Sequence, residues 1–164
     1  MRLSIVIRTL NEARYLRALL EGIAQQQCPG LDVETVVIDS GSTDGTQQIA
    51  RDFGCVLTHI TREDFSFGRS LNRGCEAASG DVFVFVSGHC VPTDAHWLHQ
   101  LCAPVVDGRV AYSYGRQIGG PESRFSECRI FEKYYTRTTR VPQTGFFCNN
   151  ANSALLRSAW AQHR

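Results

Sequence analysis

The sequence lacks any apolar run long enough to cross a membrane, and its longest apolar stretches have only the length of a β-strand. Its formal net charge is +1 and no segment is rich in Lys or Arg, which argues against a nucleic-acid partner. The apolar stretch at the N-terminus meets polar residues too early for a secretory signal peptide. We therefore expect a cytoplasmic protein with no integral membrane segment and no affinity for nucleic acid.

Closely spaced cysteine pairs and phosphate-binding glycine motifs are also missing. The seven cysteines form no C-x-x-C pair, which argues against a structural zinc site, and their odd number favours reduced thiols. The Walker pattern GxxxxGK[ST] does not occur, and GxGxxG does not follow the first apolar run. Neither of these two loops therefore holds a nucleotide in this chain.

What the sequence does contain is a regular alternation of strand-like and helix-like segments. Short apolar runs rich in β-branched residues predict strands over 3–9, 33–39, 55–60 and 82–87. Apolar residues at helical spacing predict helices over 11–27, 42–54, 68–78 and 94–106. Such alternation predicts an α/β fold with a mostly parallel central sheet flanked by helices. The second half is less periodic, and there we expect a strand over 109–117 and helices over 126–137 and 152–162.

Polar residues follow three of the predicted strands directly. Because the carboxyl ends of parallel strands line one crevice, these residues should converge there. The alternative is local: Asp39 or Ser42 caps the following helix, and Glu12 and Asp44 only complement helix dipoles. The residues alone predict a polar, ligand-binding crevice formed by Thr9, Asn11 and Glu12, by Asp39, Ser40, Gly41, Ser42, Thr43 and Asp44, and by Ser87, Gly88, His89 and Cys90.

At these positions the sequence resembles the family 2 glycosyltransferases, which are inverting enzymes with the GT-A fold. Three blocks carry the resemblance in the family's order, namely "SIVIRTLNEARYLRALLEGIAQQ", "VVIDSGSTDGTQQIA" and "FSFGRSLNRGCEAASGDVFVFVSGHCVP". A further stretch, "YGRQIGGPESRFSECRIFEKYY" with "FFCNNANSALLRSAW", resembles the bacterial rhamnosyltransferase-like branch. The resemblance implies a single GT-A (Rossmann-like) domain over 1–164, with a nucleotide-sugar-binding half at 1–92 and an incomplete acceptor-side half at 93–164.

The resemblance also assigns roles to individual residues. Asp39 matches the aspartate that hydrogen-bonds the nucleotide base, and Gly68, Arg69 and Asn72 match the segment that closes over the nucleotide. The alternative for Arg69 is a solvated helix residue, and for Asn72 it is a helix-to-loop hydrogen bond. The nucleotide-binding residues implied in this way are Thr9, Asn11, Glu12, Asp39, Ser42, Asp44, Gly68, Arg69, Asn72, Ser87 and Gly88.

The triplet Ser87-Gly88-His89 falls where the family carries its DxD-like metal motif, often a serine, any residue and an aspartate in this branch. His89 replaces the final acid, which should shift the preference of a bound divalent cation from Mg2+ toward Mn2+. The alternative is that His89 only hydrogen-bonds within its loop. The resemblance thus implies Mn2+ or Mg2+ as the cofactor and His89 as a metal ligand.

In this family an acceptor hydroxyl attacks the anomeric carbon of a nucleoside-diphosphate sugar with inversion, and a carboxylate takes the proton. The family's acid usually follows a helix that matches "NANSALLRSAW", and none is found there. Glu122, Glu127 and Glu132 match it by no motif, so the general base stays unassigned and we expect a truncated piece. The implied partners are a nucleotide-sugar donor and a saccharide or lipid-linked acceptor, in bacterial cell-surface polysaccharide synthesis.

Two other functions stay open at this point. The missing acid and His89 both favour a non-catalytic nucleotide-sugar-binding module or an inactive fragment. A Rossmann-like structural or protein-interaction domain is the alternative outside the resemblance. Stabilisation of the chain by nucleotides would exclude the last of these.

Overall fold

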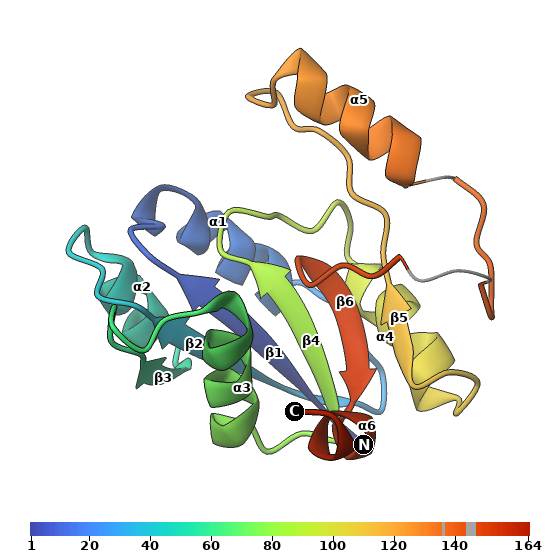
Figure 1. The fold of residues 1–164 in the computed structure, drawn as a ribbon, viewed down its shortest axis with the longest axis horizontal. Helices are drawn as coiled ribbons and strands as arrows, with labels where there is room; N and C mark the ends of the chain where they lie inside the picture. The colour runs from blue at the N-terminus through green and yellow to red at the C-terminus, as the bar shows by residue number, and fades with distance from the viewer. Residues whose placement is uncertain (136, 144–146) are drawn as a thin grey trace.

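The computed structural model describes residues 1–135, 137–143 and 147–164. Within them a six-stranded sheet with the strand order β3-β2-β1-β4-β6-β5 forms the centre of the molecule (Figure 1). The strands β3, β2, β1 and β4 run parallel to one another, whereas β6 is antiparallel to both β4 and β5. The strand bounds are β1 Arg2–Thr9, β2 Asp32–Asp39, β3 Val56–His59, β4 Val82–Ser87, β5 Tyr112–Tyr114 and β6 Asn152–Leu156.

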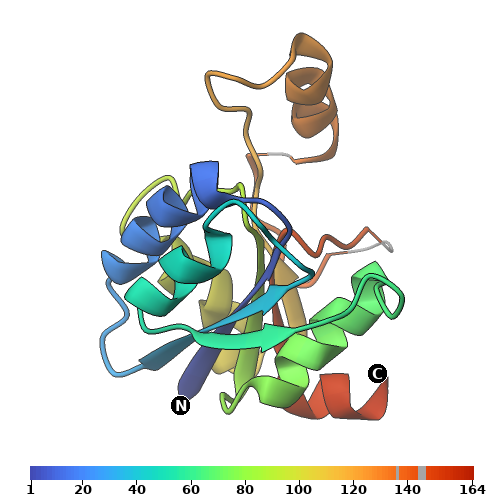
Figure 2. The same cartoon turned by 90° about the vertical axis from the view of Figure 1, so that its left-hand side faces the viewer.

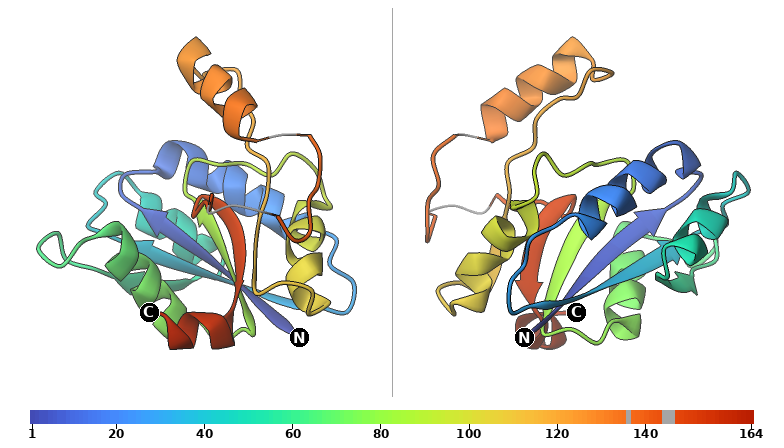
Figure 3. Two further views of the ribbon diagram at one scale, coloured as in Figure 1. Left: turned by 45° about the vertical axis from the view of Figure 1, so that its right-hand side comes forward. Right: turned by 180° about the vertical axis from the view of Figure 1, so that it is seen from behind.

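Helices cover both faces of the sheet (Figure 2). One buried apolar cluster joins the sheet to α1 (Ala13–Ala24), α2 (Thr46–Asp52) and α4 (Trp97–Val106). A second cluster joins the other face to α3 (Phe67–Ala77) and α6 (Arg157–Gln162). The helix α5 (Phe125–Tyr134) buries none of its residues and stands away from the sheet, beyond the carboxyl ends of the parallel strands (Figure 3). The alternation in the first half is therefore confirmed as an α/β sandwich around a mostly parallel sheet.

The helix predicted over 152–162 is wrong. Its first half is the strand β6, and only the part from Arg157 onward is helical. Leu155 packs against one core cluster and Leu156 against the other, which is the alternation of a strand and not the single face of a helix. The strands β4 and β5, which lie on either side, supply the backbone hydrogen bonds that make this segment extended. Within the described residues, no helix has both the length and the apolar character that crossing a membrane requires.

The cysteines are dispersed through these layers. All seven lie in the described part of the chain, and each carries a free thiol. Burial raises the pKa of both Cys75 and Cys102 to about 12, so these two stay neutral thiols and act as small apolar side chains.

Gly74 lies where α3 packs against the sheet. A Cβ atom there would lie 2.3 Å from Ile38 Cδ1 and 2.6 Å from Val6 Cγ1, and both of these side chains are buried. We expect Gly74→Ala to lower the free energy of unfolding by about 1–3 kcal/mol, the usual cost of overpacking a core. The control is Gly68→Ala in the same helix, where no atom lies within 4 Å of the added Cβ. Urea unfolding should show the loss for Gly74→Ala alone, and equal stabilities would contradict the close approach of helix and sheet.

Glu34 holds a polar network at the amino-terminal edge of the sheet. Its Oε1 accepts hydrogen bonds from Ser4 Oγ at 2.5 Å and from the backbone N–H of Ser79 at 2.6 Å. Burial raises the pKa of this carboxyl, but these hydrogen bonds and the charge of Arg2 outweigh it, so the pKa of Glu34 is lowered. Because the folded pKa lies below the unfolded one, Glu34 stabilises the fold above the unfolded pKa. That contribution is lost as the pH falls through the folded pKa.

We therefore expect Glu34→Gln to cost about 1–2 kcal/mol of unfolding free energy at neutral pH. The difference from the wild type should shrink in acid, below about pH 4. The control is Glu21→Gln, at an exposed position of α1. Urea unfolding at both pH values measures the two differences, and a loss for Glu34→Gln that does not change with pH would disprove the role of the charge.

Candidate functional site

The strands β1, β2 and β4 end at the same edge of the sheet (Figure 1), and the polar residues that the sequence singles out follow these strand ends. Thr9 at the end of β1 is in register with Asp39 at the end of β2, and Arg8 is in register with Ser87 at the end of β4. The predicted convergence of three sequence-distant segments is thus observed. The crevice lies at one edge of the sheet, where parallel α/β proteins hold their ligands.

Asp39 is the most buried charged residue at this edge, because none of its surface is exposed. Its Oδ1 accepts from the backbone N–H of Gly41 at 3.0 Å, that of Ser42 at 2.9 Å, and Gln47 Nε2 at 2.8 Å. Its Oδ2 accepts from Thr9 Oγ1 at 3.0 Å and from the Ser42 hydroxyl. Burial raises the pKa of this carboxyl, but the hydrogen bonds from Ser42, Gly41 and Gln47 lower the pKa by more than burial raises it. The pKa of Asp39 is therefore lowered, and Asp39 is an ionised acceptor.

These five donors have a consequence for nucleotide recognition. A carboxylate offers about four lone-pair sites, so a base N–H can reach Asp39 only in place of a present donor. Gln47 is a donor that the sequence analysis missed. Gln47 lies in the first turn of α2, one residue after Thr46. This position could have indicated its role from the sequence, because a side chain in the first turn can reach back to the end of the preceding strand.

Hydrogen bonds tie the loop after β1 to the loop after β2. The Asn11 backbone N–H donates to Ser42 Oγ at 2.8 Å, and the Thr43 N–H donates to Asn11 Oδ1 at 2.9 Å. Asn11 adopts a left-handed conformation with φ of 55°, which asparagine tolerates better than most residues. The two loops therefore form one preorganised surface.

Asp44 joins the same two loops from the other side. Its Oδ1 accepts from the Thr46 N–H at 3.0 Å, and its Oδ2 accepts from the Ala13 N–H at 3.0 Å. The hydrogen bond from the Thr46 hydroxyl, together with these N–H donors, lowers the pKa of Asp44 although burial opposes them. These contacts fit the local alternative, in which Asp44 stabilises the starts of α1 and α2, and a role of Asp44 in nucleotide binding stays a prediction.

Glu12 and His89 form the pair that fits a divalent cation. His89 Nδ1 lies 3.2 Å from Glu12 Oε1, and 59% of the His89 side chain and 21% of the Glu12 side chain are exposed. Gly88 allows this approach, because a Cβ there would lie 3.1 Å from Glu12 Cγ. No cluster of three or more His, Cys, Asp or Glu side chains suited to a metal occurs among the described residues. Glu12 and His89 would hold such a cation, because an imidazole and a carboxylate are both ligands that Mn2+ accepts.

The three residues predicted on α3 do not all reach this edge. Gly68 and Arg69 are exposed in the first turn of α3. Close by, the Arg8 guanidinium lies 4.7 Å from the centre of the Phe67 ring, which ties the start of α3 to β1. Asn72 lies further along the helix, where its Oδ1 accepts from Trp160 Nε1 at 2.9 Å. This hydrogen bond joins two helices, so it differs from the helix-to-loop bond of the alternative, and the role of Asn72 toward a nucleotide stays a prediction.

The three acids of the second half all have local partners. Glu122 Oε1 lies 2.5 Å from Arg14 Nη2, and its Oε2 accepts from the Tyr15 hydroxyl at 3.1 Å. Glu127 accepts from the Arg124 N–H at the start of α5, and Glu132 pairs with Arg129 on the same helix. No contact singles out one of them as a general base.

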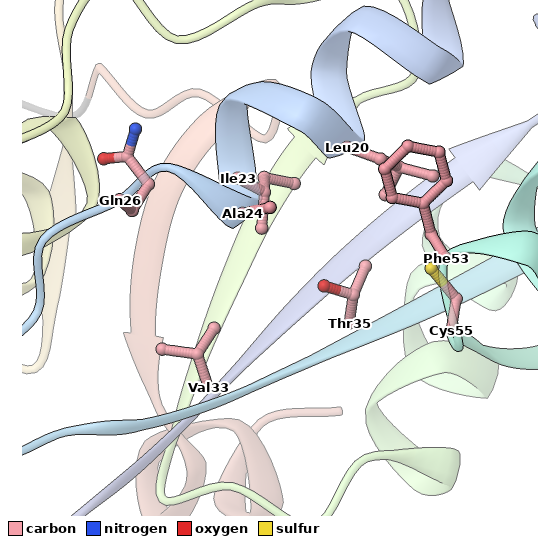
Figure 4. Close-up of a pocket in the computed structure, with 8 residues that line it drawn as sticks. All are labelled: Leu20, Ile23, Ala24, Gln26, Val33, Thr35, Phe53 and Cys55. Carbon is pink, nitrogen blue, oxygen red and sulfur yellow. The ribbon is translucent and has the colours of Figure 1, made fainter.

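A separate cavity of about 290 Å³ lies between α1 and β2 (Figure 4). Phe53 and Cys55 close one end of it, and burial raises the pKa of the Cys55 thiol to about 11. None of the predicted site residues lines this cavity. We therefore assign the functional site to the crevice and not to this cavity.

Comparison with known proteins identifies the family of the chain. The chain matches the model of Glycosyl transferase family 2 over residues 4–164. It is 32% identical over 122 residues to the glycosyltransferase AglE of Haloferax volcanii, covering 68% of this chain and 40% of that protein. It is 41% identical over 104 residues to a PGL/p-HBAD biosynthesis glycosyltransferase of Mycobacterium bovis BCG, covering 61% of this chain and 40% of that protein.

The fold is shared with the mannosyltransferase PcManGT from Pyrobaculum calidifontis, solved with GDP-Man and Mn2+. The TM-score is 0.71 at 20% identity, over 98% of this chain and 46% of that one. Fold and relatives together define a glycosyltransferase. The chain belongs to glycosyl transferase family 2, and its sheet and helices confirm the predicted GT-A fold. It spans about 40% of the length of the curated relatives it matches.

Proposed function

We propose that this chain forms the donor-binding part of a glycosyltransferase that moves a sugar, with inversion, from a nucleoside-diphosphate sugar to an acceptor hydroxyl. We place the reaction in bacterial cell-surface polysaccharide synthesis. The observation that carries the proposal is the preorganised crevice, in which the loops after β1 and β2 are hydrogen-bonded to each other around the ionised Asp39. Membership of glycosyl transferase family 2 supports the same reaction class.

Each segment has a part in donor binding. Asp39 and the loop that holds Ser42 take the nucleoside, and the first turn of α3, with Gly68 and Arg69, lies beside them. Glu12 and His89 would hold a divalent cation, and the imidazole would favour Mn2+ over Mg2+. When bound, this cation neutralises the charge that develops on the leaving diphosphate.

A panel of nucleoside diphosphates and nucleotide sugars, with and without Mn2+, tests the proposal by thermal unfolding. A ligand at about a hundred times its dissociation constant adds roughly 2.7 kcal/mol of stability, so the cognate nucleotide should raise the Tm clearly. Nucleoside monophosphates are the control, because they lack the β-phosphate that the cation contacts. A Tm unchanged by every nucleoside diphosphate would refute nucleotide binding.

A non-catalytic nucleotide-sugar-binding module is the second candidate. It is favoured by His89 at the position of the family's acid and by the local partners of Glu122, Glu127 and Glu132. Release of nucleoside diphosphate from a bound nucleotide sugar separates the two candidates. Turnover supports the transferase, and tight binding without release supports the module.

A further inference from the structure

Arg8 is a half-buried cation near the end of β1. Val6, two residues earlier on the same strand, belongs to the core cluster that joins the sheet to α3, so the side chain of Arg8 lies on the face that α3 covers. Arg8 is in register with Ile38 on β2 and with Ser87 on β4. Its side chain therefore starts between two of the strand ends that form the crevice.

Phe67, the first residue of α3, holds the guanidinium group of Arg8. The guanidinium carbon lies 4.7 Å from the centre of the Phe67 ring, and Phe65 meets the same ring edge-on with centroids 5.6 Å apart. Phe67 is nevertheless 70% exposed, so this contact lies at the protein surface and not in the core. An aromatic ring covers one face of a guanidinium group but leaves the N–H donors in its plane available. Arg8 thus presents hydrogen-bond donors beside the crevice in an orientation that Phe67 sets.

No carboxylate of the protein compensates this charge within residues 1–135, 137–143 and 147–164. Across these ranges Arg8 forms no ion pair, and its guanidinium group donates no hydrogen bond. Both oxygens of Asp39, which follows Ile38, already accept from other donors. Burial lowers the pKa of Arg8 because it disfavours the charged form, although the guanidinium group stays charged at neutral pH. An unpaired charge held partly away from water is costly, and proteins keep such costs mainly at functional sites.

The loop that carries His89 lies directly beside Arg8. A Cβ atom at Gly88 would lie 3.2 Å from the backbone oxygen of Arg8 and 3.1 Å from Glu12 Cγ. Gly88 is therefore next to both the end of β1 and the Glu12–His89 pair. An anion above this loop is within reach of the Arg8 side chain, and the diphosphate of a nucleotide sugar is the anion that the proposed function brings there.

We propose that Arg8 binds the diphosphate of the donor and makes donor binding partly independent of the divalent cation. The inference rests on the proposed function and deepens it, because it assigns a phosphate contact to a residue outside the set predicted from the sequence. A guanidinium group matches the geometry of a phosphate and binds it by paired, charge-assisted hydrogen bonds. Phe67 orients this group before the ligand arrives, which reduces the entropy that binding costs.

Calorimetric titration of UDP, GDP and dTDP in EDTA tests the proposal, with uridine, guanosine and thymidine as the phosphate-free ligands. The wild type should bind its preferred diphosphate more tightly than the matching nucleoside even without metal. Arg8→Gln should lower the affinity for this diphosphate by about tenfold or more and leave the affinity for the nucleoside unchanged. Arg8→Lys should recover part of the loss, because lysine restores the charge but not the planar fork. The matched control is Arg73→Gln, an exposed arginine on α3, which should leave all affinities unchanged.

Thermal unfolding of the free protein separates a ligand contact from a structural role. Arg8→Met keeps an unbranched apolar side chain against Phe67 and removes a charge that has no partner among the described residues. Its Tm without ligand should equal or exceed that of the wild type, because the cost of holding an unpaired charge partly away from water is gone. The preferred diphosphate should raise the Tm of this variant by less than that of the wild type. A lower Tm without ligand, together with an undiminished rise on adding the diphosphate, would make Arg8 a structural residue.

The affinities distinguish failure of this inference from failure of the proposed function. Equal diphosphate affinity of the wild type and Arg8→Gln in EDTA overturns the inference and leaves the proposed donor site standing. A loss that is equally large for the diphosphate and the nucleoside also overturns it, because Arg8 then supports the nucleoside and not the phosphates. If none of the three diphosphates binds the wild type, with or without Mn2+, the proposed function itself fails.

Discussion

Asp39→Ala should cost this chain both stability and nucleotide affinity. The substitution leaves the N–H groups of Gly41 and Ser42 and the amide of Gln47 without their acceptor at a buried position. A buried donor without a partner costs about 1–3 kcal/mol, and because these three hydrogen bonds are only part-buried, water can replace part of the loss, so we expect the free energy of unfolding to fall by about 1–3 kcal/mol. Nucleoside diphosphate affinity should fall by about tenfold or more, because the loop that carries Ser42 is no longer held.

Urea unfolding and calorimetry, at a temperature where the variant is folded, measure the two effects. Asp39→Asn keeps an acceptor for the backbone N–H groups, and its amide can donate to the hydroxyls of Thr9 and Ser42, so its stability loss should be smaller. Asp52→Ala is the control, because this α2 carboxylate is exposed and accepts from Gln48 Nε2 on the same helix. Unchanged nucleotide affinity in folded Asp39→Ala would exclude both Asp39 and the loop that it holds from the nucleotide site.

His89→Ala should abolish the effect of Mn2+ on nucleoside diphosphate binding. The variant leaves Glu12 as the remaining ligand of the pair, and we expect affinity in Mn2+ to fall by at least about tenfold, to the level measured in EDTA. Affinity without metal should be unchanged, because Asp39 and its loop are intact. His89→Asp should restore metal dependence and improve Mg2+ relative to Mn2+, since carboxylate oxygens suit the harder ion.

Calorimetry of all three proteins in Mn2+, Mg2+ and EDTA measures these differences. The control is His99→Ala, an exposed histidine on α4 away from Glu12. If His89→Ala keeps the full effect of Mn2+, then His89 is a loop residue, and the assignment of the cation to this pair is wrong.

The sequence by itself determined the parallel part of the sheet and the edge at which its strands end. The apolar runs at 3–9, 33–39 and 82–87 can bury the side chains on both of their faces only in the middle of a sheet that is covered on both sides. They lie there as β1, β2 and β4. Once such strands run parallel, the polar residues that follow them must meet at one edge. For this reason Thr9, Asp39 and Ser87 could be placed together from the sequence, and the fold confirms it.

The tertiary structure alone decided the extended segment at 152–156, the contact between Asn72 and Trp160, and the cleft that opens between α4 and β5. The extended segment depends on hydrogen bonds to β4 and β5, which are remote in sequence, and its leucines at adjacent positions fit a helix as well as a strand until those partners are present. The contact joins residues 88 positions apart, and the cleft draws on side chains between Thr93 and Asn152. Local periodicity reports only which face of a segment is apolar, whereas these features depend on which remote segment covers that face.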